Sequence, residues 1–349
     1  MAEFGAAKAS TENQDKFKSF CATATFTTDD ARKHVQEALR RRVDETKEDA
    51  LVRVRQRQPV YDVVFQQWLS THGKHVSKRE REALGMHTSS LIYGEINYES
   101  FGRTIEKIRT VYGLPGVGAS DAKGIMQQPG TGVFYDLGSG AGKPTIAAAT
   151  LFRFERALGL EFLPGLVSAS HAARERWAEV AHDMLRLIDP AEFSGLARTA
   201  VEFHRGDITD LVAHDWTIGD VVFANSTCFD DVLLAALARE ASRMRKGTFF
   251  ITFTKRLPSP HFETCEAELH QMSWGGATVY IQQKMTESCQ PTGDQPSPVA
   301  EAWAKQAKEA VVDVEADADR TPVPGCFSPL QALLGRLDLR LGPQLKEPS

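Results

Sequence analysis

The first third of the chain has the hydrophobic spacing of amphipathic helices. Residues 28–57 are mostly polar and open with a Thr-Asp-Asp sequence, which offers an N-cap and an acidic first turn for a long helix. Residues 60–69 are denser in apolar side chains and predict a packed helix. From residue 101 to residue 112 the apolar positions recur at intervals of three and four, and a Gly-Leu-Pro-Gly sequence then ends the helix.

Beyond this helical part, apolar runs alternate with amphipathic segments. The segments between the runs predict helices, including one with Trp177 on its apolar face and one over residues 230–245. Alternating strands and helices are typical of a parallel α/β sheet. We expect short buried strands at residues 133–135, 157–161, 201–204, 220–224, 248–253 and 278–282.

These patterns predict four regions. Residues 1–27 are small and polar, and we expect a flexible tail there. Residues 28–115 should form a helical N-terminal domain, and residues 116–285 an α/β domain. In residues 286–349 Pro, Ala and acidic residues dominate, so we expect a low-order tail with a short helix near residues 299–312.

Composition narrows the function classes. Of the 349 residues 42% are hydrophobic and 25% are charged, as in ordinary globular proteins. The five cysteines contain no Cys-x-x-Cys pair, which argues against a disulfide scaffold and against a zinc site, so we expect no metal. A net charge of -5 does not favour a general polyanion binder. We find no membrane-length apolar run and no secretory signal, and therefore expect an intracellular enzyme without a membrane partner.

The most informative stretch is a glycine-rich turn after the first predicted strand. A triphosphate-binding loop is excluded, because Leu137 stands where its first glycine belongs and Pro144 follows Lys143. A dinucleotide fingerprint is disfavoured, because Lys143 occupies its third glycine position. The pattern acidic-x-Gly-x-Gly-x-Gly instead resembles the first motif of S-adenosylmethionine-dependent methyltransferases. It is formed here by Asp136-Leu137-Gly138-Ser139-Gly140-Ala141-Gly142.

The chemistry of that ligand suits these residue types. S-adenosylmethionine has no phosphates, and glycines allow the backbone to approach it closely. Asp136 at the strand end can attract its cationic amino-acid end. Glu161 ends the second predicted strand, where an acidic side chain can bind both ribose hydroxyls. Asp207 follows the third strand and can accept from the adenine amino group.

The residues at the end of the fourth predicted strand limit the class of molecule that can accept the methyl group. Amino-directed nucleic-acid methyltransferases carry Asp/Asn-Pro-Pro-aromatic here, and both prolines are missing, which disfavours base methylation. The segment at 225–229 is instead similar to the Asn-Asn-Phe-Ala-Phe element of the disruptor-of-telomeric-silencing (Dot-one) family, the non-SET histone-lysine methyltransferases. Ser226-Thr227-Cys228 depart from that element, so the shape of the substrate channel is left open.

Further motifs of this family follow in order between residues 91 and 284. They are Tyr93-Gly94-Glu95, the glycine motif, Gly159-Leu160-Glu161, Arg205-Gly206-Asp207, and Ser273-Trp274 followed by Tyr280. The resemblance implies a class I methyltransferase Rossmann-like sheet, mostly parallel, with a helical N-terminal domain and with S-adenosylmethionine as cofactor. By carry-over, the cofactor contacts are Tyr93, Glu95, Asp136, Gly138, Gly140, Gly142, Glu161, Asp207 and Asn225. The residues near the lysine channel are Asn225, Phe229, Trp274 and Tyr280.

A DNA contact has one candidate, the arginine-bearing helix with Arg40, Arg41, Arg42, Arg53, Arg55 and Arg57. Acidic residues interrupt this run, and a solvated helix with internal charge pairs is the favoured interpretation. A contact with nucleosomal DNA through Arg40, Arg41 and Arg42 is the alternative.

Methyl transfer to lysine requires a neutral amine. From a reference pKa of about 10.4, deprotonation at pH 7 costs about 4.6 kcal/mol. An aromatic channel and the nearby sulfonium would both lower the pKa of that amine, and no general base is assigned.

The leading hypothesis is a protein-lysine methyltransferase acting on a core histone in nucleosomes. The alternatives are a non-histone protein or small-molecule acceptor, and a catalytically silent binding module on the same fold. We expect nuclear localisation for a histone-directed enzyme and cytoplasmic localisation otherwise.

Overall fold

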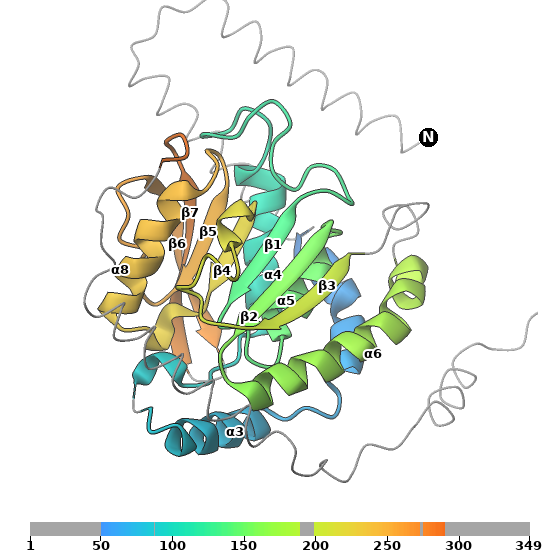
Figure 1. Cartoon of the computed structure of the whole chain (residues 1–349). Helices are drawn as coiled ribbons and strands as arrows, with labels where there is room; N and C mark the ends of the chain where they lie inside the picture. Colours follow the sequence, from blue (N-terminus) through green and yellow to red (C-terminus); the bar gives the residue numbers. More distant parts are fainter. Residues whose placement is uncertain (1–49, 87, 189–198, 273–274, 290–349) are drawn as a thin grey trace, which may run out of the picture. The chain divides into compact units, whose positions relative to one another are not determined.

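A seven-stranded sheet forms the centre of the computed structural model, which describes residues 50–86, 88–188, 199–272 and 275–289 (Figure 1). The strand order is β3-β2-β1-β4-β5-β7-β6. The strands are β1 (Val133–Leu137), β2 (Arg156–Glu161), β3 (Ala200–Arg205), β4 (Val221–Ala224), β5 (Phe249–Phe253), β6 (Phe262–Met272) and β7 (Gly275–Lys284).

The helices precede the sheet in the chain and then connect its strands. A helix over residues 50–65 comes first among the described residues. The others are α3 (Ser70–Ala83), α4 (Tyr98–Lys107), α5 (Lys143–Leu151), α6 (Pro164–Ile188) and α8 (Asp231–Glu240). The predicted helix after residue 101 is confirmed, and a π-helical turn over Ile108–Tyr112 carries it to Gly113.

The sheet has the expected class I methyltransferase topology. Neighbours from β3 through β5 pair in parallel, whereas β7 pairs antiparallel with β5 and with β6. The strand order reverses between β1 and β4, and in open α/β sheets a ligand crevice forms where such neighbouring connections diverge, at the carboxyl ends of the strands. The predicted mostly parallel sheet is confirmed.

Two apolar layers cover the sheet. On one face α4, α5, α6 and the helix over residues 50–65 pack on β1 and β4, and Phe101 lies edge-on against Phe134 and Phe223 with ring centroids 6.1 and 5.2 Å apart. On the other face α8 packs with Trp216 and Leu160. Successive side chains on a strand point to opposite faces, so the continuous apolar runs of β1 and β4 pack against both layers.

Three elements differ from the sequence prediction. Strand β6 was not predicted, because it lies at the sheet edge and most of its side chains are exposed or half-buried. Helix α3 was missed because its sequence is almost entirely polar. The predicted break between residues 57 and 60 is absent, because one helix over residues 50–65 continues through Pro59, whereas residues 28–49 of the predicted first helix lie outside the described residues.

The three described arginines of the predicted DNA-contact helix, Arg53, Arg55 and Arg57, each bind another part of the protein. Arg53 binds the fully buried Glu106 at 2.8 Å, Arg55 binds Glu99 at 3.1 Å, and the buried Arg57 donates to the carbonyl of Leu151. The buried Arg57 thus departs from the predicted solvated helix face, whereas Arg55 keeps an exposed position and a charge pair as predicted. Arg40, Arg41 and Arg42 lie outside the described residues.

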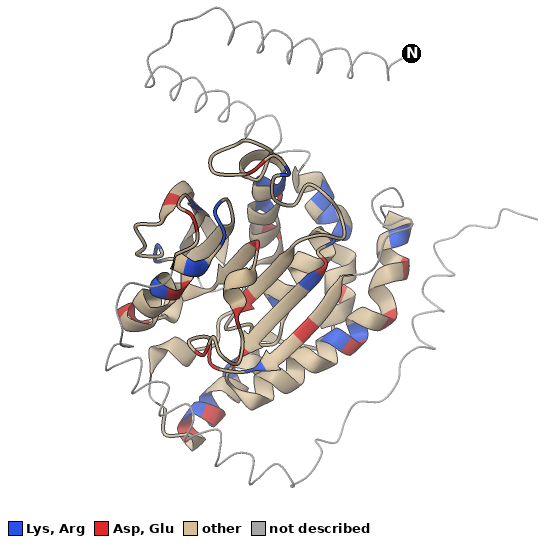
Figure 2. Ribbon diagram, turned by 45° about the horizontal axis from the view of Figure 1, so that its top comes forward, with Lys and Arg blue, Asp and Glu red and all other residues tan. Residues whose placement is uncertain are grey.

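Charges of both signs are interspersed on the helices seen in Figure 2. Within the described ranges, every helix is too short or too polar to cross a membrane.

The packing of Phe101 gives a stability prediction. Its side chain has no exposed surface and lies between the helical layer and the sheet, so Phe101→Ala should lower the free energy of unfolding by about 3–5 kcal/mol. Urea denaturation measures this, with Leu269→Ala as a control at an exposed site of β6 that should change it by less than about 0.5 kcal/mol. Equal effects of the two substitutions would contradict the packing described here.

Candidate functional site

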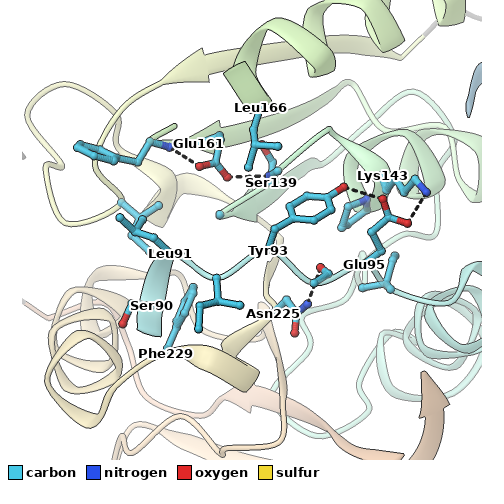
Figure 3. A pocket seen from close by; sticks show the side chains of 18 of the residues that line it. Ser90, Leu91, Tyr93, Glu95, Ser139, Lys143, Glu161, Leu166, Asn225 and Phe229 are labelled. Carbon is cyan, nitrogen blue, oxygen red and sulfur yellow. Dashed lines mark hydrogen bonds and ion pairs between the residues drawn. The ribbon is translucent and has the colours of Figure 1, made fainter. Parts of the chain in front are cut away.

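One cavity lies at the carboxyl ends of β1, β2 and β4, where the order of the strands reverses (Figure 3). Segments from the helical N-terminal part, the sheet and α8 all contribute to its lining. The predicted residues among the lining are Tyr93, Glu95, Gly138, Gly140, Glu161, Asp207, Asn225 and Phe229. The fold therefore brings together side chains from motifs that are more than a hundred residues apart.

The glycine turn requires glycine on conformational grounds. Gly138, Gly140 and Gly142 have φ angles of 79°, 56° and 84°, in the left-handed region that other residues rarely adopt. A Cβ atom on Gly140 would lie 2.6 Å from Cε2 of Tyr93, and one on Gly142 would lie 2.5 Å from Cζ of Phe203. Gly140 thus faces the cavity, whereas Gly142 does not line it and packs beneath the turn.

Glu161 ties the glycine turn to the start of α6. Its Oε2 accepts from the Gly140 amide at 2.8 Å, and its Oε1 accepts from the amides of Phe162 and Leu163 at 2.9 Å each. Burial raises the pKa of Glu161, and these three N–H donors oppose that rise. A carboxylate has about four acceptor positions, so about one is left for a ligand hydroxyl, where the sequence predicted contacts with two.

Asp136 lies beneath the cavity rather than in its lining. Its side chain is fully buried, and its Oδ2 accepts from the Thr145 hydroxyl at 2.9 Å. Its Oδ1 has no hydrogen-bond partner among the described residues. Burial raises the pKa of Asp136 to about 8, and the charge of Glu161 contributes. An approaching cation would favour the ionised form of this carboxyl.

Glu95 is the centre of a polar cluster to which the helical N-terminal part and the start of α5 both contribute. Its Oε1 accepts from the Tyr93 hydroxyl at 2.8 Å and from Nε1 of Trp68 at 3.2 Å, and its Oε2 binds Nζ of Lys143 at 2.6 Å. Figure 3 shows Glu95 between Tyr93 and Lys143. The sequence prediction missed Lys143 and Trp68. Lys143 directly follows the third glycine of the turn. This position could have indicated it, because the start of α5 must face the same crevice as the turn.

Asn225 and Asp207 occupy two further sides of the cavity. Asn225 donates from Nδ2 to the carbonyl of Gly94 at 3.2 Å, which connects the end of β4 to the Tyr93-Gly94-Glu95 segment. Asp207 accepts from the amide and the hydroxyl of Thr209 at 2.8 Å each. Phe229 is buried, and its ring lies beside Gly138. Phe229 thus lines the cavity close to the glycine turn.

Among the described residues assigned to the lysine channel, Tyr280 is absent from the lining of the cavity. Tyr280 is half-buried in β7 opposite Thr252 of β5 and does not line the cavity, although its row of the sheet is that of Leu137 and Ala224, the last residues of β1 and β4. Trp274 lies outside the described residues, so its predicted role stays a prediction.

The lining suits a nucleoside joined to a cationic amino acid. Glu95, Glu161 and Asp207 bring carboxylates to it and Lys143 an ammonium group, while Phe162, Leu166 and Phe229 give it apolar walls. A Cβ on Gly138 would lie at contact distance from the ring of Phe229, 3.6 Å from its Cζ, and the unpartnered Oδ1 of Asp136 lies close beneath the turn. The residues present therefore fit S-adenosylmethionine.

The buried Asp136 predicts a pH dependence of stability. Its pKa rises from 3.8 in the unfolded chain to about 8 in the folded protein, so the folded state holds a proton that the unfolded state has lost between these values. Its contribution to the free energy of unfolding should therefore fall as the pH rises from about 4 to about 8. Asp136→Asn should remove this fall, which denaturation at a series of pH values measures.

Thr145→Val is the matched control, because it removes the hydrogen bond but keeps the titrating carboxyl. It should retain the fall. If Asp136→Asn and the wild-type protein showed the same pH profile, the buried carboxyl would not be its source.

Several solved structures are similar to this chain. TrmN from Thermus thermophilus is 16% identical over 60% of this chain and 53% of its own, with a TM-score of 0.34, so the chain spans about half of that protein. A putative methyltransferase, yhhF from Escherichia coli, is 11% identical over 44% and 78%, with a TM-score of 0.33. Precorrin-6y C5,15-methyltransferase from Geobacter metallireducens is 13% identical over 53% and 87%, with a TM-score of 0.32.

Comparison with protein families gives a match to the histone methylation protein DOT1 over residues 124–275. Among curated proteins, none matches the sequence. The matched range holds the glycine turn, Glu161, Asp207, Asn225 and Phe229, whereas Tyr93, Glu95 and Tyr280 lie outside it. The family supports an S-adenosylmethionine-dependent methyltransferase. Over residues 124–275 the chain therefore carries the resemblance to the DOT1 histone methylation family that its motifs predicted.

Proposed function

We propose that this protein transfers a methyl group from S-adenosylmethionine to the side-chain amine of a lysine in a protein, with a core histone in nucleosomes as the acceptor. The observation that carries the proposal is the gathering of the predicted cofactor residues around one cavity at the point where the strand order reverses. The match to the histone methylation protein DOT1 supports the acceptor class.

The roles of the residues follow from their chemistry. S-adenosylmethionine, when bound, supplies a methyl group already activated by a sulfonium. Glu161 and Asp207 would bind the nucleoside, Glu95 and Lys143 the charged amino-acid end, and Phe229 would exclude water beside the glycine turn. Alignment of the amine with the methyl group is then the main contribution of the protein, an effect that can supply several kcal/mol.

The acceptor amine must reach the cavity without its proton. At pH 7 this costs about 4.6 kcal/mol for an ordinary lysine. Like-charge repulsion from the sulfonium of the bound cofactor would lower the pKa of the amine. Desolvation beside Phe229 would lower this pKa as well. After transfer the methylated ammonium releases one N–H proton to water, and the carboxyls of the site need not take it.

Partners and location belong to the same proposal. A nucleosomal acceptor would place the enzyme in the nucleus and would bring DNA near Arg40, Arg41 and Arg42 of the N-terminal region. A non-histone or small-molecule acceptor would use the same cofactor cavity with a cytoplasmic enzyme. A catalytically silent module would bind the cofactor and transfer nothing.

Transfer of labelled methyl groups separates these hypotheses. The full chain is incubated with labelled S-adenosylmethionine and, in parallel, with nucleosomes, free core histones and a cell extract. Label on a histone lysine, identified by mass spectrometry, is the expected result. Label confined to other acceptors in the extract would contradict the histone acceptor, and cofactor binding without transfer to any of the three would overturn the proposed function.

A substitution in the glycine turn tests the cofactor site directly. Gly140→Arg should abolish binding of S-adenosylmethionine, because its Cβ would already meet the ring of Tyr93 and the rest of the side chain would fill the cavity. Isothermal titration calorimetry measures the affinity. Gly116→Arg is the matched control, since Gly116 also has a positive φ of 73° but has open space at the Cβ position. Wild-type affinity in Gly140→Arg would exclude the cavity as the binding site.

A further inference from the structure

Two threonine hydroxyls lie next to each other beyond the cavity, at the ends of β4 and β5. Thr227 belongs to the short helical turn Ser226–Cys228 after β4, and Thr254 directly follows β5. Their Oγ1 atoms are 3.0 Å apart. Neither lines the cavity, but Thr227 also donates to Oδ1 of the cavity residue Asn225 at 3.0 Å. The pair therefore extends the polar wall of the cavity toward the surface.

These hydrogen bonds run from the carbonyl of Gly94 through Asn225 and Thr227 to Thr254. The carbonyl at the Gly94 end determines which group donates in each of them. The carbonyl of Gly94 can only accept, so the Asn225 group that faces it at 3.2 Å is the donor Nδ2. Oδ1 of Asn225 then faces Thr227, whose single hydroxyl hydrogen points at it. Since Thr227 has no second hydrogen, the contact between the threonines is made by the hydrogen of Thr254. The outward side of Thr254 Oγ1 thus presents lone pairs only.

The backbone holds Thr254 in an unusual position. Its φ angle is 66°, in the left-handed region, which is rare for a β-branched residue. Its amide donates to the carbonyl of Thr278 at 2.7 Å, and the amide of Lys255 donates to the carbonyl of Phe253 at 2.7 Å. Backbone strain of this kind costs about 1–3 kcal/mol and is concentrated at functional sites. Here it places an exposed hydroxyl against Thr227, at the end of the strand beside β4.

We propose that Thr254 Oγ1 accepts a hydrogen bond from the amine of the methyl acceptor, and that Thr227 and Asn225 orient this hydroxyl. The inference rests on the proposed function and specifies its acceptor side. A neutral primary amine has two N–H groups and one lone pair. An N–H held by Thr254 would leave the lone pair free to turn toward the cofactor. An ionised thiol or hydroxyl has no hydrogen to donate, so the site favours a nitrogen nucleophile.

Substitution by valine tests the proposal, because valine keeps the shape and the β-branch of threonine but removes the hydroxyl. Thr254→Val and Thr227→Val should each lower kcat/KM for the protein acceptor about tenfold, the size expected for one hydrogen bond. The affinity for S-adenosylhomocysteine in calorimetry and the denaturation midpoint should stay at their wild-type values. Thr254→Ser and Thr227→Ser should restore kcat/KM, since serine keeps the hydroxyl.

The two positions should also depend on each other. Thr227 acts only by orienting Thr254, so the double valine variant should lose no more than Thr254→Val alone. Thr264→Val is the matched control on the exposed edge strand β6 and should leave kcat/KM unchanged.

Wild-type kcat/KM in Thr254→Val would overturn this proposal and leave the proposed function intact. A loss shared by Thr264→Val, or one that serine does not reverse, would also overturn it. If the wild-type protein methylates no amine at all, the proposed function fails, and the role of Thr254 fails with it.

Discussion

The hydrogen bonds of the Glu161 carboxylate hold the cavity together. Three backbone amides, one from the glycine turn and two from the segment leading into α6, converge on this side chain at the end of β2. A buried carboxylate is costly unless it is hydrogen-bonded, so the carboxylate and the three amides stabilise each other. Without Glu161, the Gly140 amide would lose its partner, and the turn would be held by the amides of Gly138 and Ser139, which donate to the carbonyl of Leu160. The geometry of the nucleoside end depends on this contact.

The helical N-terminal part closes the other end of the cavity. The ring of Tyr93 lies so close to Gly73 of α3 and to Gly140 that neither glycine could carry a Cβ without displacing it. Glu95 is bound by Trp68 from the same part and by Lys143 from the start of α5. Glu80 of α3 accepts from the amide of Gly165 at 2.8 Å, at the start of α6. The site is thus shared between two regions that the sequence presents as separate.

The acceptor side combines two opposing requirements. A lysine amine loses its proton more easily in apolar surroundings, which Phe229 and Leu233 provide around the cavity. Orientation of that amine instead requires a polar group, which is the role proposed for the hydroxyl of Thr254, 3.0 Å from that of Thr227. Thr227, one of the residues at which the chain departs from the family element, supplies the hydroxyl that contacts Thr254. The change from the family element at Thr227 and the strained backbone at Thr254 therefore contribute to the same contact between two hydroxyls.

The sequence by itself determined the strands of the parallel sheet, the glycine turn and the carboxylates at the strand ends. It could do so because the carboxyl ends of neighbouring parallel strands meet at one edge, so order along the chain predicts proximity there. The exposed strand β6 and the polar helix α3 gave no apolar pattern and appeared only in the structure. The tertiary structure alone decided that Glu161 binds backbone amides, that Tyr280 does not line the cavity, and that Lys143 pairs with Glu95. These depend on the directions of side chains far apart in sequence, which packing fixes and which local spacing does not encode.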